Sequence, residues 1–278
     1  MSRTARLIVA GIVVVLVVVL IGLVYIWVSG GSATPSATLV APTLELATRQ
    51  PTTEATPEAA SAASTESPAA ATAESTAESA ATEAAAAATP ESAASASDLT
   101  VFGIVADDSE VRFILNEMLR GSPNEVRGTT SLIAGQIGVD FANPQNSQVG
   151  EIRIDARDLS TDNEMRNRAI RSAILQSAQD QFEFISFKPT SLDGLPASVT
   201  MGEAFEFQVT GDLTIRDITN PVTFDVTVTP VSETRIEGTA TATVQRGDYG
   251  LTIPNVPGVA DVDEAVRLEI DFVATPVS

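Results

Sequence analysis

The C-terminal part of the chain is patterned for β-structure, because apolar and polar residues alternate there from residue 98 onward. Successive side chains of a strand point to opposite faces, so this period of two predicts strands with one buried face. We expect strands at residues 100–106, 110–119, 126–132, 135–141, 150–156, 182–192, 205–215, 222–228, 235–245 and 266–272. Turn residues at 107–109, 121–124, 143–146 and 219–221 separate several of them. About ten closely spaced strands predict a barrel or sandwich.

One segment, residues 161–174, breaks this alternation and predicts a helix. Thr161 followed by Glu164 has the spacing of a capping box. One helical face would carry Met165, Ala169, Ile170 and Ala173. The helix also carries three arginines, which we expect to form a solvated face rather than an anion site: Arg166, Arg168 and Arg171.

An uncharged apolar run, residues 7–28, lies near the N-terminus. A helix of this length reaches about 33 Å, enough to cross a hydrocarbon core of about 30 Å. We therefore expect residues 1–28 to form a cytoplasmic tip and a single transmembrane helix, with Arg3 and Arg6 keeping the N-terminus in the cytoplasm. A cleaved signal peptide is the alternative, although its apolar region usually spans about 7–15 residues. The C-terminal domain would then be extracytoplasmic, on a single-pass protein of the cell membrane.

Residues 29–97 consist almost entirely of Ala, Ser, Thr, Pro and Glu. Such a segment cannot bury enough apolar surface to offset the loss of chain entropy. We expect a disordered stalk that acts as a spacer, with glycosylation or partner binding as the alternative. The folded domain is then residues 98–278.

Composition excludes several chemistries. The chain has neither cysteine nor histidine, which removes disulfides, thiolate nucleophiles, imidazole bases and the usual zinc sites. Its formal net charge of −20 makes nucleic acid and anionic lipid headgroups poor partners for the protein surface. An activated Ser109 beside Asp107 and Asp108 would need another base, and Lys188 is the only lysine. We therefore expect no enzyme activity and no cofactor.

A metal site is not expected either. Asp261, Asp263 and Glu264 offer several oxygen atoms close together in the sequence. They lack the glycine and the terminal glutamate of an EF-hand loop, so we interpret them as a solvated acidic turn.

Small side chains dominate one parity of residues 235–245, where Ile236, Gly238, Ala240, Ala242 and Val244 alternate with polar residues. Facing the aromatic residues of other strands, these positions could leave a lumen open. Close packing of backbone or of the helix on this strand explains them equally well.

The motifs along the domain resemble those of the YceI-like family. The resemblance rests on DDSEVRFILNEML, EVRGTT, IRIDARDLSTDNEMRNRAI, FEFISFKPTSL, VTGDLTIRDITNPVTFDVTV and VQRGDYGL, in this order over residues 99–275. It implies an all-β, extended antiparallel lipocalin-like β-barrel with one short helical insertion, which binds isoprenoid quinones or fatty-acid derivatives inside. Where members of the family commonly carry histidines, this chain has Glu117 and Ala169 nearby, so a headgroup role of those histidines does not transfer.

These observations predict a membrane-anchored extracytoplasmic protein that holds an apolar or amphiphilic ligand, and they leave a homodimer open. The alternative is a non-catalytic surface interaction module with a filled barrel. Arg246 and Asp248 would form an ion pair at the barrel mouth, or else a clamp at a strand end. The candidate lumen residues are Phe113, Leu115, Ile152, Ile154, Phe184, Phe207, Leu213, Phe224, Val226, Ala240 and Ile270.

Overall fold

The computed structural model describes residues 33–36, 39–44 and 99–277. The predicted transmembrane segment, residues 7–28, lies outside these ranges. Among the described residues, no helix has the length and apolar character needed to cross a membrane.

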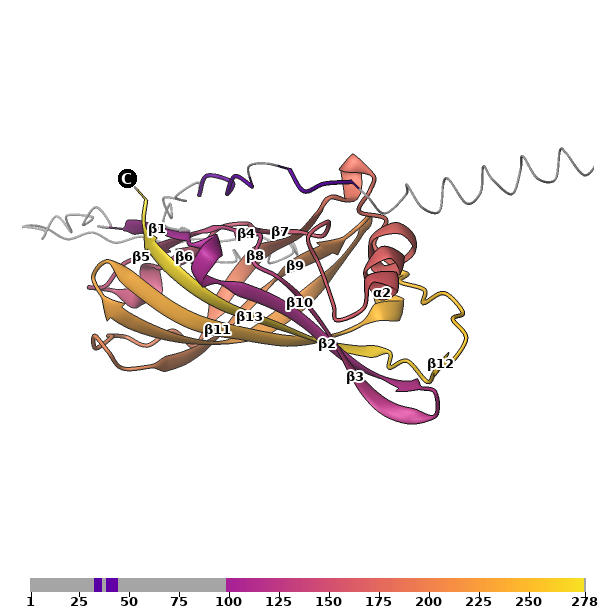
Figure 1. The fold of residues 1–278 in the computed structure, drawn as a ribbon. Helices are drawn as coiled ribbons and strands as arrows, with labels where there is room; N and C mark the ends of the chain where they lie inside the picture. Colours follow the sequence, from indigo (N-terminus) through magenta and orange to yellow (C-terminus); the bar gives the residue numbers. More distant parts are fainter. Residues whose placement is uncertain (1–32, 37–38, 45–98, 278) are drawn as a thin grey trace, which may run out of the picture. The chain divides into compact units, whose positions relative to one another are not determined.

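Thirteen strands of the described domain form one sheet (Figure 1). The strands are β1 (Thr100–Ile104), β2 (Glu110–Leu119), β3 (Ser122–Thr130), β4 (Ile133–Ala134), β5 (Gln136–Val139), β6 (Gln148–Val149), β7 (Ile152–Asp155), β8 (Phe184–Asp193), β9 (Phe205–Ile215), β10 (Ile218–Ser232), β11 (Arg235–Gln245), β12 (Val259–Ala260) and β13 (Ala265–Pro276). The helical elements are α2 (Glu164–Ala169), the π-helical turn η3 (Ile170–Ile174), and the 3₁₀ turns η1 (Ala106–Asp108), η2 (Pro144–Asn146), η4 (Asp180–Phe182) and η5 (Arg246–Tyr249).

All strand pairs are antiparallel, and their order is β4-β7-β8-β9-β10-β11-β13. Beyond β11, the long β13 pairs with β2 along residues 267–271 and with β1 along residues 274–276. β3 then pairs with β2, and β5 and β6 continue from β1.

The sheet curves back on itself where β3 passes into β4. β3 pairs with β2, whereas β4, only two residues later, pairs with β7. Beside this crossing, Thr129 and Ser160 exchange both backbone hydrogen bonds, with N···O distances of 2.8 and 3.0 Å. The result is an antiparallel half-barrel with one short helix, which confirms the predicted all-β class of a lipocalin-like fold.

Alternation sets which side chains face the interior. Along β9, Val209, Leu213 and Ile215 are buried while their polar neighbours are more exposed. The same holds for the even-numbered positions of β10 and β11. The period of two in the sequence therefore predicted the inward faces of these strands correctly.

The predicted helix is present, but its cap is not the predicted one. Asn163 is the N-cap, and its side chain accepts hydrogen bonds from the backbone N–H groups of Met165 and Arg166. Thr161 instead donates its N–H and hydroxyl to Oδ1 of Asn167, which is almost fully buried. Met165, predicted on the buried face, is 69% exposed. The capping prediction failed because Thr161 bonds to a buried side chain rather than to the helix backbone.

The predicted turn at residues 219–221 is also wrong. These residues belong to β10, and the hairpin turns at Arg216 and Asp217 instead, because Ile218 pairs with Ile215. Pro221 is tolerated in the strand because β11 pairs with β10 only from Asp225 onward, so no second strand of the described domain pairs with this part of β10.

Residues 33–36 and 39–44 have no regular secondary structure and are hydrogen-bonded to the half-barrel (Figure 1). They belong to the range predicted as a disordered stalk. The rest of that range up to residue 97 lies outside the described residues.

Candidate functional site

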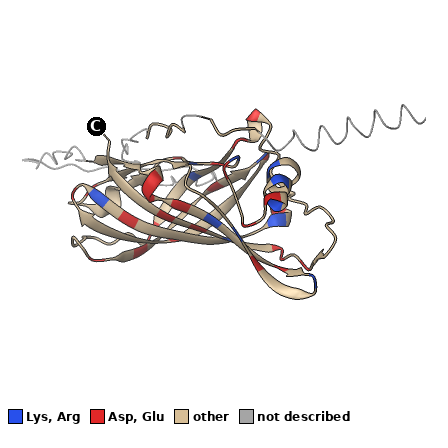
Figure 2. Ribbon diagram, in the orientation of Figure 1, with Lys and Arg blue, Asp and Glu red and all other residues tan. Residues whose placement is uncertain are grey.

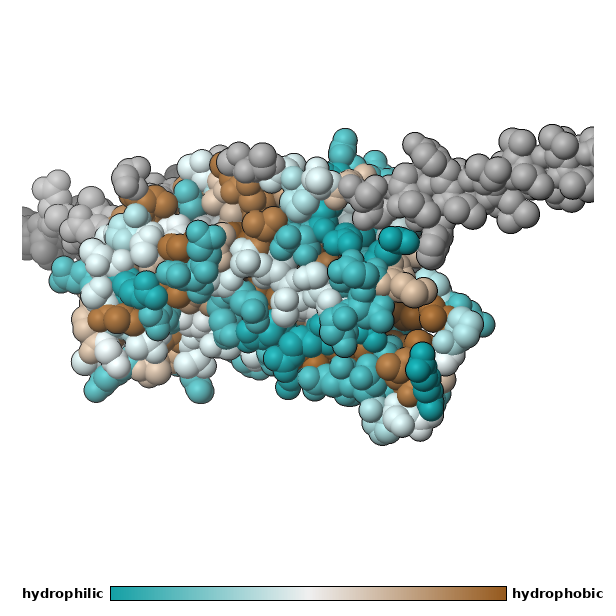
Figure 3. Space-filling model, viewed as in Figure 1, coloured by the Kyte–Doolittle hydropathy of each residue, from teal (hydrophilic) through white to brown (hydrophobic). Residues whose placement is uncertain are grey.

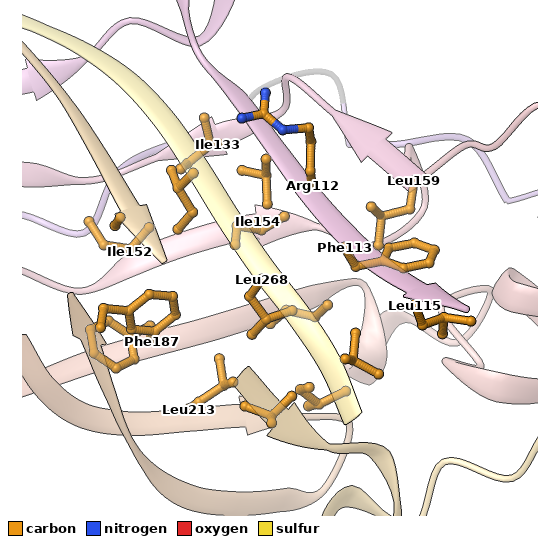
Figure 4. A pocket seen from close by; sticks show the side chains of 18 of the residues that line it. Arg112, Phe113, Leu115, Ile133, Ile152, Ile154, Leu159, Phe187, Leu213 and Leu268 are labelled. Carbon is orange, nitrogen blue, oxygen red and sulfur yellow. The ribbon is translucent and has the colours of Figure 1, made fainter. Parts of the chain in front are cut away.

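The half-barrel encloses a cavity with a volume of about 1090 Å³. Its wall is apolar over most of its area. Strands that are distant from one another in the order of the sheet contribute to this wall. Figure 4 shows Phe113 and Leu115 from β2, Ile154 from β7, Phe187 from β8 and Leu213 from β9 around one shared space. A continuous apolar interior of this size can accommodate a ligand.

Ten of the eleven predicted lumen residues line this cavity. They come from strands that are far apart in the sequence and meet only through the curvature of the sheet. The ten are Phe113, Leu115, Ile152, Ile154, Phe207, Leu213, Phe224, Val226, Ala240 and Ile270.

Phe184 is the exception, because it is not among the lining residues. On β8 the cavity is lined by Ile185 and Phe187, which have the opposite parity, and then by Leu192. A bulge between Pro189 and Ser191 shifts the register against β9 and switches the inward parity along the strand. Leu192 lines the cavity, and strict alternation along β8 would place Phe184 on the same inward face. Because the bulge lies between them, Phe184 does not line the cavity.

The small residues of β11 serve both purposes that the sequence left open, which are close packing and an open lumen. Gly238 is a site of close packing, because a Cβ atom there would lie 2.5 Å from Cζ of Phe272. Ala240 and Val244, by contrast, line the cavity. Phe187 and Phe224 line the same cavity and pack edge to face, with 4.9 Å between their ring centroids.

A charged pair interrupts the apolar wall beside the helix. Glu117 on β2 is buried, and its Oε1 accepts hydrogen bonds from Arg166 Nη2 and Asn124 Nδ2, each at 3.0 Å. Arg166 also pairs with Asp162 at 2.5 Å. Both Glu117 and Arg166 line the cavity, so Arg166 is not the solvated side chain that the sequence predicted.

The sequence held one signal for this pair. Glu117 continues the inward parity of Phe113 and Leu115, and a carboxylate at an inward strand position needs a partner. Its partner, Arg166, lies 49 residues further along the chain, so local patterning could not identify it.

The predicted Arg246–Asp248 ion pair is wrong. Arg246 pairs with Glu264 and donates to the backbone carbonyls of Asp263 and Leu251, at 3.0 and 3.2 Å. The two residues are not on an extended strand, because the chain turns into η5 at Arg246. Arg246 lines the cavity, whereas Asp248 does not and accepts a hydrogen bond from Asn220 through its backbone carbonyl.

The hydroxyl of Ser109 has a structural role. It donates to the Val105 carbonyl at 2.7 Å and accepts from the Val273 N–H at 3.1 Å. These bonds attach η1 to β13 and occupy the hydroxyl, so the Asp107-Asp108-Ser109 motif does not form an activated nucleophile. In the described part of the chain, no group of three acidic residues is arranged to hold a metal ion.

Two buried carboxyl groups have shifted pKa values. The backbone N–H of Asn143, with the side-chain amide of Asn146 and the N–H of Ala142, lowers the pKa of Asp140, which lines the cavity. Burial raises the pKa of Asp155, which is fully buried and whose Oδ2 has no hydrogen-bond partner among the residues that the structure describes. Burial also raises the pKa of Tyr249 to about 12.

The fold and the cavity together define an antiparallel lipocalin-like half-barrel with an apolar interior. Residues 102–274 match the YceI-like domain, and the chain belongs to this family. No curated protein sequence matches the chain.

Solved structures with a similar fold share little sequence. One is a polyisoprenoid binding domain from Saccharophagus degradans implicated in plant cell wall breakdown, at 15% identity and a TM-score of 0.51, with 64% of this chain and 99% of that chain covered. Another is Burkholderia cenocepacia BcnA, at 19% identity and a TM-score of 0.48, with 62% and 99% covered. A Campylobacter jejuni YceI protein has 13% identity and a TM-score of 0.43, with 52% and 82% covered. At these identities the similarity shows the fold alone.

Proposed function

We propose that this protein is a membrane-anchored extracytoplasmic binding protein that holds an apolar or amphiphilic ligand in its cavity. The observation that carries the proposal is the cavity volume of about 1090 Å³ with a largely apolar wall. Ligand pockets usually measure about 300–1,000 Å³, so this space suits a long ligand. Burial of an alkyl or isoprenoid chain there contributes about 0.8 kcal/mol for each CH₂ group.

An isoprenoid, quinone or fatty-acid derivative fits this description. The similar fold from Saccharophagus degradans is named a polyisoprenoid binding domain, which supports the same class of ligand here. The Glu117–Arg166 pair adds charged groups to one part of the wall. These groups can hydrogen-bond to a polar head while the chain occupies the apolar interior, which favours an amphiphile over a pure hydrocarbon.

Membrane anchoring rests on the sequence. Residues 7–28 form an uncharged apolar run long enough to span a bilayer, with Arg3 and Arg6 before it. A single span oriented in this way places the half-barrel outside the cytoplasm. The ligand would then be bound close to the membrane in which such molecules dissolve.

Native mass spectrometry of the full-length chain, purified in detergent from a lipid-containing host, tests the binding proposal. We expect a bound lipid that delipidation removes and that a fluorescent fatty-acid or isoprenoid probe replaces. Leu213→Glu places a carboxylate in the wall and should abolish binding, whereas Phe184→Ala, outside the cavity, should retain it. Absence of both a copurified lipid and probe binding in the unmodified protein would contradict the proposal and favour a surface interaction module.

A further inference from the structure

Residues 33–36 and 39–44, here called the strap segment, are held on the half-barrel by specific polar contacts. The Ser36 N–H donates to Oε1 of Glu183 at 2.8 Å, and Arg157 Nη1 donates to the Thr34 carbonyl at 3.4 Å. Further along, the Leu44 N–H donates to Oε1 of Gln136 at 2.7 Å. The segment is therefore bound at both ends and is not a free spacer.

Two of the residues that contact the strap segment, Arg157 and Glu183, are themselves held in place by other polar contacts. Arg157 and Glu183 are both buried and form an ion pair at 3.0 Å. Arg157 also donates from Nε to the Ser177 carbonyl at 2.7 Å and from Nη2 to Asp180 at 2.6 Å. The Thr34 carbonyl and the Ser36 N–H thus hydrogen-bond to this buried polar network. A buried polar group without its hydrogen-bond partner costs folding free energy, so these contacts favour the bound strap segment.

This network places the start of the strap segment beside the helical end of the domain. Ser177 and Asp180 follow shortly after α2 and η3, and Ala169 and Ala173 of these elements line the cavity. Figure 1 shows the strap segment running from this end along the side of the sheet where β7 and β4 lie. The first described residues of the strap segment therefore lie on the same end of the domain as α2.

The same end of the domain exposes apolar side chains of the cavity wall. Met165 on α2 is 69% exposed and Val256 in the loop before β12 is 38% exposed, and both line the cavity. Figure 3 shows apolar surface at this end, where α2 and β12 lie in Figure 1. An exposed apolar rim that continues into an apolar cavity is typical of a surface that contacts lipid.

The local charge at this end differs from that of the whole chain, whose net charge is −20. On α2 and η3, Arg166, Arg168 and Arg171 stand against Glu164, and Arg166 is paired with Glu117 and Asp162 (Figure 2). The surplus of arginine over acidic residues in these two elements reduces the repulsion of this end by anionic headgroups.

The length of chain before the strap segment sets how far this end can lie from the bilayer. Only residues 29–33 separate the predicted membrane span from Thr34. Six peptide steps from residue 28 to residue 34 reach at most about 21 Å, whereas a free stalk over residues 29–97 would reach up to about 240 Å.

We infer that the strap segment docks the α2 end of the half-barrel onto the bilayer surface, so that Met165 and Val256 contact lipid and the cavity opens toward the membrane. The partner is the lipid bilayer that holds residues 7–28. A ligand then passes between lipid and cavity without crossing water. This inference rests on the proposed membrane anchor and adds to it the orientation and distance of the domain.

The test uses the full-length chain in liposomes that contain an acceptor-labelled lipid. The chain has no native cysteine, so a single donor dye is attached through Thr252→Cys, next to the rim, or Glu233→Cys, in the β10–β11 loop. Glu233 follows the last residue of β10, whereas Gly250, two residues before Thr252, lies against Ile218 at the start of this strand. The 15 residues of β10 span about 46 Å. We expect strong energy transfer to lipid from the first site and weak transfer from the second.

Two matched insertions separate the strap segment from a free stalk. A flexible Gly/Ser insertion of about 20 residues adds about 25 Å of root-mean-square reach. Placed between Gly30 and Gly31, it should abolish most of the transfer from Thr252→Cys. Placed between Ala70 and Ala71, after the docked segment, it should leave that transfer unchanged. Equal loss from both insertions, equal transfer from both dye sites, or failure of the chain to enter liposomes would overturn the inference.

Probe binding measured on the same samples distinguishes this inference from the proposed function. A chain that binds the probe but shows equal transfer from both dye sites has the proposed ligand and a different orientation. A chain that shows the expected transfer without probe binding is docked as inferred but lacks the proposed ligand. Each result therefore identifies which of the two statements fails.

Discussion

Glu117 on β2 accepts a hydrogen bond from Arg166 on α2 at 3.0 Å, and both side chains line the cavity. The side chain of Glu117 is 6% exposed and that of Arg166 is 20% exposed, so water screens this pair only partly. The pair fixes the helix against the sheet and places charge on an otherwise apolar wall.

A double-mutant cycle measures the strength of this pair. For Glu117→Gln and Arg166→Gln we expect a coupling energy of about 1–2 kcal/mol in urea unfolding. The exposed pair Glu125 and Arg127, at 3.4 Å, is the matched control and should couple by only about 0–0.5 kcal/mol. Equal coupling in the two cycles would show that burial of Glu117 adds nothing.

Ala240→Phe tests whether the space beside β11 is open. The ring can enter the cavity, so the midpoint of thermal unfolding should stay within a few degrees while the affinity for a fluorescent fatty-acid probe falls. Ala242→Phe is the control, because Ala242 is equally buried but does not line the cavity. Overpacking at Ala242 should cost about 1–3 kcal/mol. A similar destabilisation by both substitutions means that the barrel is filled.

Ligand affinity should increase with chain length. Each added CH₂ contributes about 0.8 kcal/mol, which is at most about a fourfold gain in affinity. Competition of a saturated fatty-acid series against one probe measures this slope, and the gain should stop when the chain exceeds the cavity. Affinity that does not depend on chain length would place the ligand outside the apolar interior.

Stability should depend on pH through Asp140. Its pKa is lowered in the folded state, mainly by the Asn143 N–H, so the folded state favours the carboxylate. This contribution is present above the unfolded pKa of about 3.9 and is lost as pH falls through the folded value. Relative to Asp140→Asn, the unmodified protein should therefore lose stability in urea unfolding as pH falls from about 3.9 through the folded pKa.

Asp155 provides the comparison with the opposite sign. Burial raises its pKa, so the folded state favours the protonated form. Relative to Asp155→Asn, the unmodified protein should lose stability as pH rises from about 3.9 through the folded value. The same pH trend for both variants would contradict the assigned causes.

Much of the sheet could be predicted from local pattern, because strict alternation marks a strand with one buried face. The predicted ranges 110–119, 205–215 and 235–245 coincide with β2, β9 and β11. The inward parity then identified most of the cavity wall. When a sheet curves into a barrel, the inward-facing side chains of all its strands meet in the interior. The cavity wall can therefore be predicted from the alternation alone, without knowing individual contacts.

The errors arose where a distant contact overrides the local pattern. The bulge at Pro189 turned Phe184 away from the cavity, and Asn167 took the hydrogen bonds expected of a helix cap at Thr161. Arg246 forms its ion pair with Glu264 rather than with Asp248, because β11 ends before Arg246 and the chain turns into η5. The strap segment has a composition typical of a spacer, and its contacts with Glu183 and Gln136 are to residues 147 and 92 positions away.

Photocrosslinking tests most directly whether the cavity is the binding site. A fatty acid with a diazirine near the end of its chain is bound to the full-length protein in detergent, irradiated, and located by peptide mass spectrometry. We predict crosslinks to cavity-lining residues of β9, β11 and β13, which Leu213→Glu removes and Phe184→Ala leaves unchanged. Crosslinks confined to outward-facing residues, or unchanged by Leu213→Glu, would contradict the account.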